Sequence, residues 1–168
     1  MGTTIPIKKA GWLLGFLGLT AGAAALGGAF TAPAVNTWYR TLRKPTWNPP
    51  NWLFGPVWTL LYAMMAVSAW LVYREMPTAG PGRGEGRLAL AAWMAQLALN
   101  ISWSAAFFGR RRIGAAVAII SALWSAILTT VLLSARVAKP AALLLLPYLA
   151  WTTFAGFLNY RVWQMNRD

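Results

Sequence analysis

Residues 44–62, KPTWNPPNWLFGPVWTLLY, decide the fold of this chain, because a proline-rich lead-in runs directly into a long apolar segment. Pro45, Pro49 and Pro50 lack backbone N–H groups and restrict the residues before them, which predicts a rigid, non-helical lead-in. We expect Asn51 to cap the helix that follows. Pro56 falls within the first turns of that helix, where a missing N–H is tolerated. The stretch therefore predicts a helix that begins near residue 51.

The aromatic side chains of this stretch allow two interpretations. Trp47, Trp52 and Trp58 are amphipathic rings that suit either the membrane–water boundary or a wide ligand pocket. Six residues separate Trp52 from Trp58, so these two do not share a helix face, whereas Trp58 and Tyr62, four apart, do. These residues alone do not distinguish an interfacial aromatic belt from the wall of a binding site.

The composition is that of an integral membrane protein. The chain has 168 residues, of which 58% are hydrophobic and 11% charged, far from the balance of a soluble domain. Its apolar runs lie at about 11–32, 51–73, 88–108, 113–135 and 141–163, and each is long enough to cross a bilayer. The first run exceeds the apolar core of a cleaved signal peptide, so we expect a retained helix. The sequence predicts an all-α membrane protein, a single domain over residues 1–168 with five transmembrane helices.

The charge distribution indicates lipid contacts and topology. Lys and Arg number 15 against three acids, for a net charge of +12. The basic residues lie between apolar runs, which is typical of contacts with lipid headgroups, and no nucleic-acid motif is present. The two sides carry similar numbers of basic residues, but the dense turn at 110–112 favours a cytoplasmic loop one and C-terminus, with the N-terminus outside. We expect a multi-pass protein of a bacterial cell membrane.

The missing residue types exclude several kinds of chemistry. The chain has no cysteine and no histidine, so it has no disulfide, thiolate or imidazole metal site and no usual general base. We therefore expect no metal. No acidic residue falls inside an apolar run, which disfavours ion-coupled transport.

Two segments beyond residues 44–62 are candidates for a site. Loop one, about 33–50, is long and aromatic, and loops of that kind often cover a site. The third apolar run carries one stripe at helical spacing, made of Trp93, Gln96, Asn100, Trp103 and Phe107. An amide in mid-membrane must find a partner, so the stripe predicts either interhelical hydrogen bonds or a pocket wall. Four glycines in the first run indicate tight packing or a self-association face, namely Gly11, Gly15, Gly18 and Gly22.

Three blocks together resemble one family. Residues 44–62, then QLALNISWSAAFFG at 96–109 and LLLLPYLAWTTFAGFLNYRVW at 143–163, are similar to the tryptophan-rich sensory protein/translocator protein family, also called peripheral benzodiazepine receptors. The resemblance covers about residues 33–166. It implies a five-helix membrane protein, often a homodimer, with a pocket under loop one. Such pockets bind porphyrins such as protoporphyrin IX, benzodiazepine- and isoquinoline-type drugs and, in some members, sterol.

The resemblance also implies site residues. Trp58 and Trp151 match a pair implicated in light-dependent porphyrin degradation, so they are the candidate catalytic residues of an alternative, enzymatic function. No cofactor is required, and the porphyrin is ligand or substrate. A further alternative is a sterol or lipid carrier. The resemblance implies drug or porphyrin contacts at Trp47, Tyr62, Asn100, Trp103, Ala155 and Leu158. Together with Trp38, Trp52, Trp58 and Trp151, these are the expected ligand contacts.

The chemistry of the aromatic and basic residues is consistent with a flat ligand. The sterol motif of the family, by contrast, is incomplete in this chain. A porphyrin is a wide π surface with two carboxylates, which indoles can stack on and Arg40, Arg43 and Lys44 of loop one can pair with. The family's sterol motif needs a spacer between its tyrosine and its basic residue, but Arg161 follows Tyr160 directly. This departure puts sterol binding in doubt.

Overall fold

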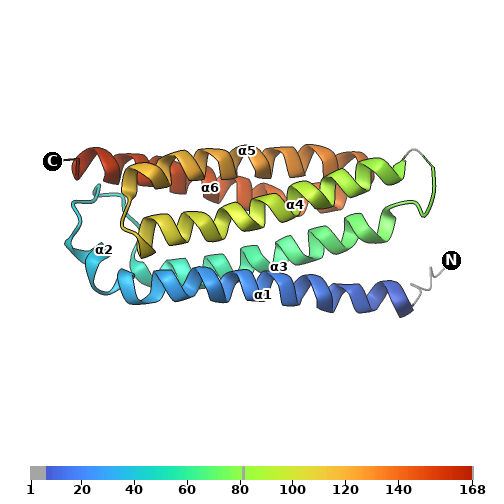
Figure 1. The fold of residues 1–168 in the computed structure, drawn as a ribbon, viewed down its shortest axis with the longest axis horizontal. Coiled ribbons are helices and arrows are strands. Elements are labelled where there is room, and N and C mark those ends of the chain that lie inside the picture. The colour runs from blue at the N-terminus through green and yellow to red at the C-terminus, as the bar shows by residue number, and fades with distance from the viewer. Residues whose placement is uncertain (1–6, 81, 168) are drawn as a thin grey trace.

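Five long helices lie side by side along one axis in the computed structural model, which describes residues 7–80 and 82–167 (Figure 1). They are α1 (Ile7–Val35), α3 (Asn51–Glu75), α4 (Gly82–Ser104), α5 (Ile113–Val137) and α6 (Lys139–Met165). A short helix α2 (Trp38–Thr41) lies in loop one, and a π-helical turn η1 (Ala105–Gly109) ends α4. Five segments are long and apolar enough to cross a membrane, one for each long helix. The predicted all-α bundle with five spans is confirmed.

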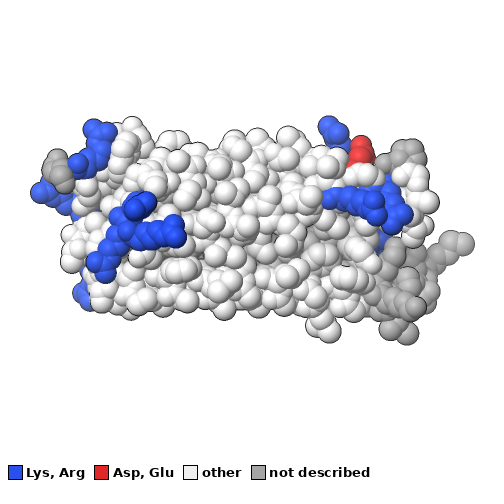
Figure 2. Space-filling view, viewed as in Figure 1, with Lys and Arg blue, Asp and Glu red and all other residues white. Residues whose placement is uncertain are grey.

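The helices run back and forth, so the connections gather at two ends. Loop one, the turn after η1 and the C-terminal end of α6 lie at one end, while the start of α1 lies at the other (Figure 1). Helix α1 packs on α3 and α4, and α6 packs on α3 and α5. On the face shown in Figure 2, basic side chains gather at both ends and the middle carries none. The charged residues of the described part of the chain all lie in the connections or near helix ends. This distribution fits a membrane around the middle, and the side that faces the cytoplasm stays a prediction.

Two expectations about helix ends were wrong. Asn51 is the first helical residue and makes no capping bond, because Pro50 occupies the N-cap in an extended conformation and its carbonyl accepts from Leu53 N at 3.0 Å. The connection between the apolar runs expected at about 51–73 and 88–108 is also shorter than these limits predict, since α4 already begins at Gly82. Near the start of α4, Gly86 packs closely against the end of α3, because a Cβ on Gly86 would lie 2.5 Å from Cγ of Met76. Local composition does not reveal such a contact between two helix ends.

Polar side chains join the helices inside the bundle. Trp93 Nε1 of α4 donates to the Met65 carbonyl of α3 at 3.1 Å, and Ser68 Oγ of α3 donates to the Ala141 carbonyl of α6 at 2.8 Å. Hydrocarbon provides no partner for such groups, so each bond also fixes the rotation of its helix. The predicted stripe on α4 does face inward, because Trp93, Gln96 and Asn100 are each about 1% exposed. The interior near the loop-one end is nevertheless incompletely filled.

Candidate functional site

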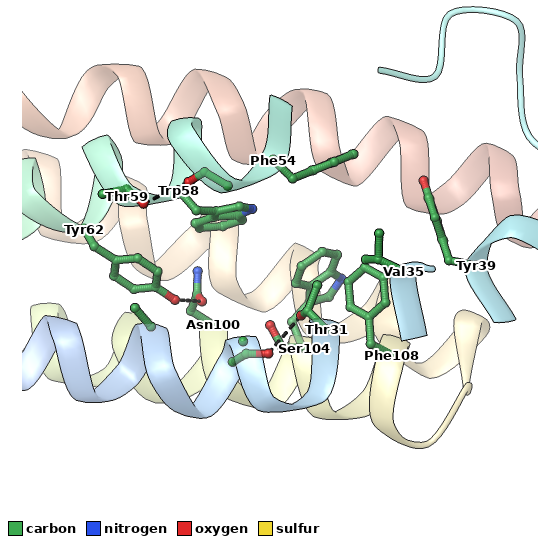
Figure 3. Close-up of a pocket in the computed structure, with 15 residues that line it drawn as sticks. Thr31, Val35, Tyr39, Phe54, Trp58, Thr59, Tyr62, Asn100, Ser104 and Phe108 are labelled. Carbon is green, nitrogen blue, oxygen red and sulfur yellow. Dashed lines mark hydrogen bonds between the residues drawn. The ribbon is translucent and has the colours of Figure 1, made fainter. Parts of the chain in front are cut away.

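A cavity of about 260 Å³ lies between α1, α3 and α4 close to loop one. Six of its 15 lining residues are aromatic and the others are mostly small and neutral (Figure 3). The aromatic side chains on it are Tyr39, Phe54, Trp58, Tyr62, Trp103 and Phe108. The non-aromatic residues on it are Ala24, Gly27, Gly28, Thr31, Val35, Gly55, Thr59, Asn100 and Ser104. No ionisable acid or base stands among these lining residues except the two phenols, so the cavity suits an apolar, planar guest.

The inner end of the cavity is a hydrogen-bonded trio from three helices. Tyr62 Oη of α3 donates to Asn100 Oδ1 of α4 at 2.7 Å, and Asn100 Nδ2 donates to Tyr148 Oη of α6 at 2.9 Å. Tyr62 and Asn100 line the cavity, whereas Tyr148 is fully buried behind them. The predicted role of Asn100 as interhelical glue is therefore confirmed, and the same amide also faces the cavity. A ligand here meets one phenol and one amide that neighbouring bonds already hold in place.

Two indoles lie next to each other on the cavity wall. The ring centroids of Trp58 and Trp103 are 6.5 Å apart, with planes inclined by 32°. Trp103 Nε1 donates to Asn159 Oδ1 of α6 at 3.0 Å, and Asn159 Nδ2 donates to the Ile113 carbonyl at 3.2 Å. This chain of bonds fixes the Trp103 ring against its neighbours. Indole faces held in this way present a preformed surface for an aromatic ligand.

The π-turn η1 changes which phenylalanine reaches the cavity. Arg110 N donates to the Ala105 carbonyl, five residues back, at 2.8 Å. A wider turn of this kind shifts the following side chains around the helix axis. Phe107, which continues the predicted stripe, packs against Tyr39 and Trp103 with 3% of its surface exposed, while Phe108 lines the cavity. Sequence spacing alone predicts an unbroken α-helix here and so does not indicate Phe108.

Loop one closes the outer end of the cavity. Tyr39 of α2 is 3% exposed, and its Oη donates to Asn48 Oδ1 at 2.7 Å. Burial raises the pKa of the Tyr39 phenol to about 12, so this donor stays protonated. Lys44 Nζ donates to the carbonyls of Tyr39 and Leu42 at 2.6 and 3.0 Å and lies over the Tyr39 ring. Lys44, proposed from the sequence to pair with carboxylates, is thus engaged in holding the loop itself.

A second fastening joins loop one to the end of α6. Arg43 N donates to Asn166 Oδ1 at 3.1 Å, and Asn166 Nδ2 donates back to the Arg43 carbonyl at 2.9 Å. The same Nδ2 lies 2.7 Å from the Val162 carbonyl, which ties Asn166 to its own helix. One side chain therefore pairs with both backbone groups of a loop residue 123 positions away. Sequence reasoning missed Asn166 because a polar residue at a helix end carries no signal of such a partner.

The other expected contacts lie outside the cavity. Trp38 packs on Phe107, and Trp47 packs on Phe154. Trp52 is 72% exposed. Ala155 and Leu158 are buried in the packing of α6 against its neighbours.

Trp151 does not line the cavity but contacts a residue that does. Its ring packs edge-on against Phe54, a residue of the cavity wall, at 6.0 Å. Its Nε1 is buried and, within the described residues, has no hydrogen-bond partner. The structure therefore brings Trp58 and Trp103 together on the cavity wall, whereas Trp151 does not line the cavity and contacts Phe54, which does.

Helix α1 supplies a wall that sequence reasoning did not indicate. Gly27, Gly28 and Thr31 line the cavity, although none of the three carries a chemical signal in the sequence. A Cβ on Gly27 would lie 3.3 Å from Ser104 Oγ, so the missing side chain lets α1 approach α4 closely. Tight packing in the bundle was one expectation for Gly11, Gly15, Gly18 and Gly22, but all four are exposed, and a Cβ on any of them would meet no atom of another helix within 4 Å. The close approach of helices occurs at Gly27 instead.

The arrangement can bind, but it offers little for acid–base or metal chemistry. Within the described residues, no group of three or more His, Cys, Asp or Glu side chains is placed to hold a metal ion. Thr31 and Thr59 donate their hydroxyls to carbonyls of their own helices, at 2.8 and 2.9 Å. Recognition here depends on ring surfaces and a few fixed polar groups, which is the pattern of a ligand site.

Comparison with known proteins agrees with this architecture. The TspO/MBR family profile matches residues 16–164. A tryptophan-rich protein TspO of Chlorobaculum tepidum is 42% identical over 150 residues, 89% of this chain and 92% of its own length. The translocator protein of Bos taurus is 38% identical over 154 residues, 92% and 89% of the two chains. A tryptophan-rich sensory protein of Cereibacter sphaeroides is 37% identical over 145 residues, 86% and 85%. With five membrane-spanning helices and a match of this extent, the chain is a multi-pass membrane protein that belongs to the TspO/MBR family.

Proposed function

We propose that this protein binds tetrapyrroles such as protoporphyrin IX in the cavity and acts in porphyrin sensing, transport or regulation. The observation that carries the proposal is the neutral aromatic cavity with Trp58 and Trp103 on its wall and the Tyr62–Asn100 pair at its inner end. Stacking on fixed indoles favours a planar π system, and the polar pair offers a hydrogen bond to a ring nitrogen or substituent. Relatives named sensory and translocator proteins support the same direction.

The cavity volume bears on which ligands fit without rearrangement. At about 260 Å³ it lies just under the range of about 300–1,000 Å³ typical of small-molecule sites. A neutral drug of two or three fused rings, such as a benzodiazepine or isoquinoline, suits this volume. A four-pyrrole macrocycle is larger, so binding it requires part of the ring to extend beyond the cavity or the helices to separate slightly.

The carboxylates of a porphyrin find complementary charge at the loop-one end. Basic side chains at this end belong to loop one, the turn after η1 and the last turns of α6 (Figure 2). Within the described residues the acidic side chains, Glu75 and Glu85, belong to the opposite end. An anionic edge directed towards loop one therefore meets positive charge, which favours one orientation of the macrocycle.

Equilibrium binding of protoporphyrin IX to the protein in lipid nanodiscs tests the proposal. We expect saturable binding, and Trp58→Leu to weaken it about tenfold, which corresponds to about 1.4 kcal/mol. Trp124→Leu removes an indole of α5 that lines no part of this cavity and serves as the matched control. Fluorescence of the porphyrin itself gives the readout, because both variants remove a protein fluorophore. Absence of saturable binding to the unsubstituted protein would reject the proposal.

Homodimer formation is a separate proposal. On the outer surface of α1 and α4, Gly15, Gly18 and Gly22 face a shallow groove together with Ala98. Small residues let the helices of two copies approach closely in lipid. If this face joins two copies, Gly18→Leu lowers the dimer fraction seen by cross-linking in membranes, and an unchanged fraction would contradict the assignment.

Sterol binding gains little support from α6. Leu158 is buried in the bundle, whereas Tyr160 is 41% exposed. The leucine and tyrosine of the incomplete motif therefore do not form one outer surface for a sterol, and we do not favour a sterol carrier.

A further inference from the structure

We propose that the cavity opens sideways through a gap between α1 and α3, and that hydrophobic ligands reach it from the bilayer. This inference rests on the proposed function of the same cavity. On the α3 side of the wall, Gly55 and Thr59 are exposed, and on the α1 side Gly28 and Thr31 are partly exposed. Asn100, on the opposite wall, is 1% exposed. The cavity therefore reaches the molecular surface between α1 and α3 and is closed towards α4.

Glycines keep this gap open. A Cβ built on Gly28 or on Gly55 meets no atom within 4 Å, so space remains on both sides of the opening. By contrast, a Cβ on the adjacent Gly27 would lie 3.3 Å from Ser104 Oγ, where α1 closes against α4. Both helices thus carry a glycine with open space around it where they line the cavity, which leaves room between them.

The edges of the opening are compatible with lipid. Thr31 Oγ1 donates to the Gly27 carbonyl at 2.8 Å, and Thr59 Oγ1 donates to the Gly55 carbonyl at 2.9 Å. Each hydroxyl is thereby satisfied within its own helix, so it can face hydrocarbon without an unpaired donor. A water-facing mouth has no need of this arrangement, since water would satisfy the hydroxyls.

The depth of the opening places it beside acyl chains. Gly55 and Thr59 lie four and eight residues after the first residue of α3, which is about 6 and 12 Å along the axis at 1.5 Å per residue. Both flanking helices are among the five segments able to cross the membrane. Trp52 lies three residues before Gly55, on the same face of α3, and is 72% exposed. An exposed indole there suits the membrane–water boundary just above the opening.

The aqueous route is closed by the fastenings of loop one. Tyr39 is bonded to Asn48, and Asn166 is bonded to both backbone groups of Arg43. A ligand that arrived from water would have to break these bonds, whereas one dissolved in the bilayer passes between glycines. The structure therefore favours lateral access, which also suits ligands that partition strongly into lipid.

Rates of protoporphyrin IX binding in nanodiscs test the route. Gly55→Leu adds a side chain to the slot, and we expect association and dissociation both to slow by about tenfold, because a narrower path delays passage in each direction. Gly28→Leu narrows the same slot from α1 and should slow both rates in the same way. A second variant keeps the test valid if one of the two fails to fold. Gly11→Leu is the control, since its Cβ also meets nothing within 4 Å and it lies away from the cavity.

A variant in which loop one is loosened distinguishes entry from the bilayer from entry from water. Asn166→Ala should leave the association rate within twofold of the unsubstituted protein if ligands enter from the bilayer. Faster association in this variant, or unchanged rates in both glycine variants, would overturn lateral access while leaving the proposed function intact. No binding by the unsubstituted protein would reject both.

Discussion

Tyr62 of α3 and Asn100 of α4 share a hydrogen bond of 2.7 Å at the inner end of the cavity, and the same amide reaches Tyr148 of α6 at 2.9 Å. One side chain thus links the three helices that carry most of the residues expected to contact ligand. Stability of the bundle and the shape of the site depend on the same group. A substitution here should therefore change both.

Asn100→Leu should destabilise the bundle by about 1–2 kcal/mol, because it leaves the buried Tyr62 and Tyr148 hydroxyls without this partner in a surrounding that offers few others. Unfolding free energy in lipid bicelles measures the effect. Ser102→Ala is the matched control on the same helix, since Ser102 is exposed and its hydroxyl bonds only to the carbonyl of Ala98 in its own helix. Equal stability of the two variants would contradict a structural role for Asn100.

Periodicity along single helices explains how much of the site was predictable. Trp58 and Tyr62 on α3, and Asn100 and Trp103 on α4, recur at spacings of three and four, and all four line the cavity. Residues on one face of a helix stay together however the helix is placed in the bundle, so spacing along each helix was sufficient to predict them.

Contacts between helices explain what was not predictable. The rotation of α6 relative to α3 leaves Trp151 in contact with Phe54 and off the cavity wall, and no pattern within either helix encodes that rotation. The π-turn at η1 adds a residue to one turn and moves Phe108 inward. Gly28 contributes to the wall by lacking a side chain, which sequence chemistry cannot distinguish from ordinary packing.

Asn166→Ala should loosen loop one without unfolding the bundle. It removes the bonds to the amide and carbonyl of Arg43, and a lost hydrogen bond at such a partly exposed position costs about 0.5–1.5 kcal/mol. We expect hydrogen exchange of loop one to speed up about tenfold, while exchange in the middle of α3 stays unchanged. Asn51→Ala is the matched control, because Asn51 is exposed and makes no capping bond. Equal exchange in the two variants would argue against a fastening at Asn166.

The loop should also lose stability at high pH because of Tyr39. Burial raises the pKa of Tyr39 to about 12 in the folded protein, against about 10 for an exposed phenol. Below about pH 10 both states keep the proton, and between about pH 10 and 12 only the unfolded loop loses it, so folding stability falls as pH rises. The difference in tyrosine absorbance between the unsubstituted protein and Tyr39→Phe should titrate near 12. A midpoint near 10 would show that the phenol is not buried as described.

If the protein consumes protoporphyrin IX in light, Trp58 should matter more than Trp151. The ring of Trp58 lines the cavity, whereas Trp151 lies behind Phe54 with its Nε1 buried. An indole in contact with the excited porphyrin donates an electron more readily than one separated from it by another ring. Under steady illumination we expect Trp58→Phe to slow porphyrin loss at least about tenfold more than Trp151→Phe, a difference of about 1.4 kcal/mol in barrier. Porphyrin absorbance and product chromatography follow the reaction, with a dark sample and Trp124→Phe as controls. Equal slowing in both variants would contradict the greater role of Trp58, and no slowing in either would remove both tryptophans from the chemistry.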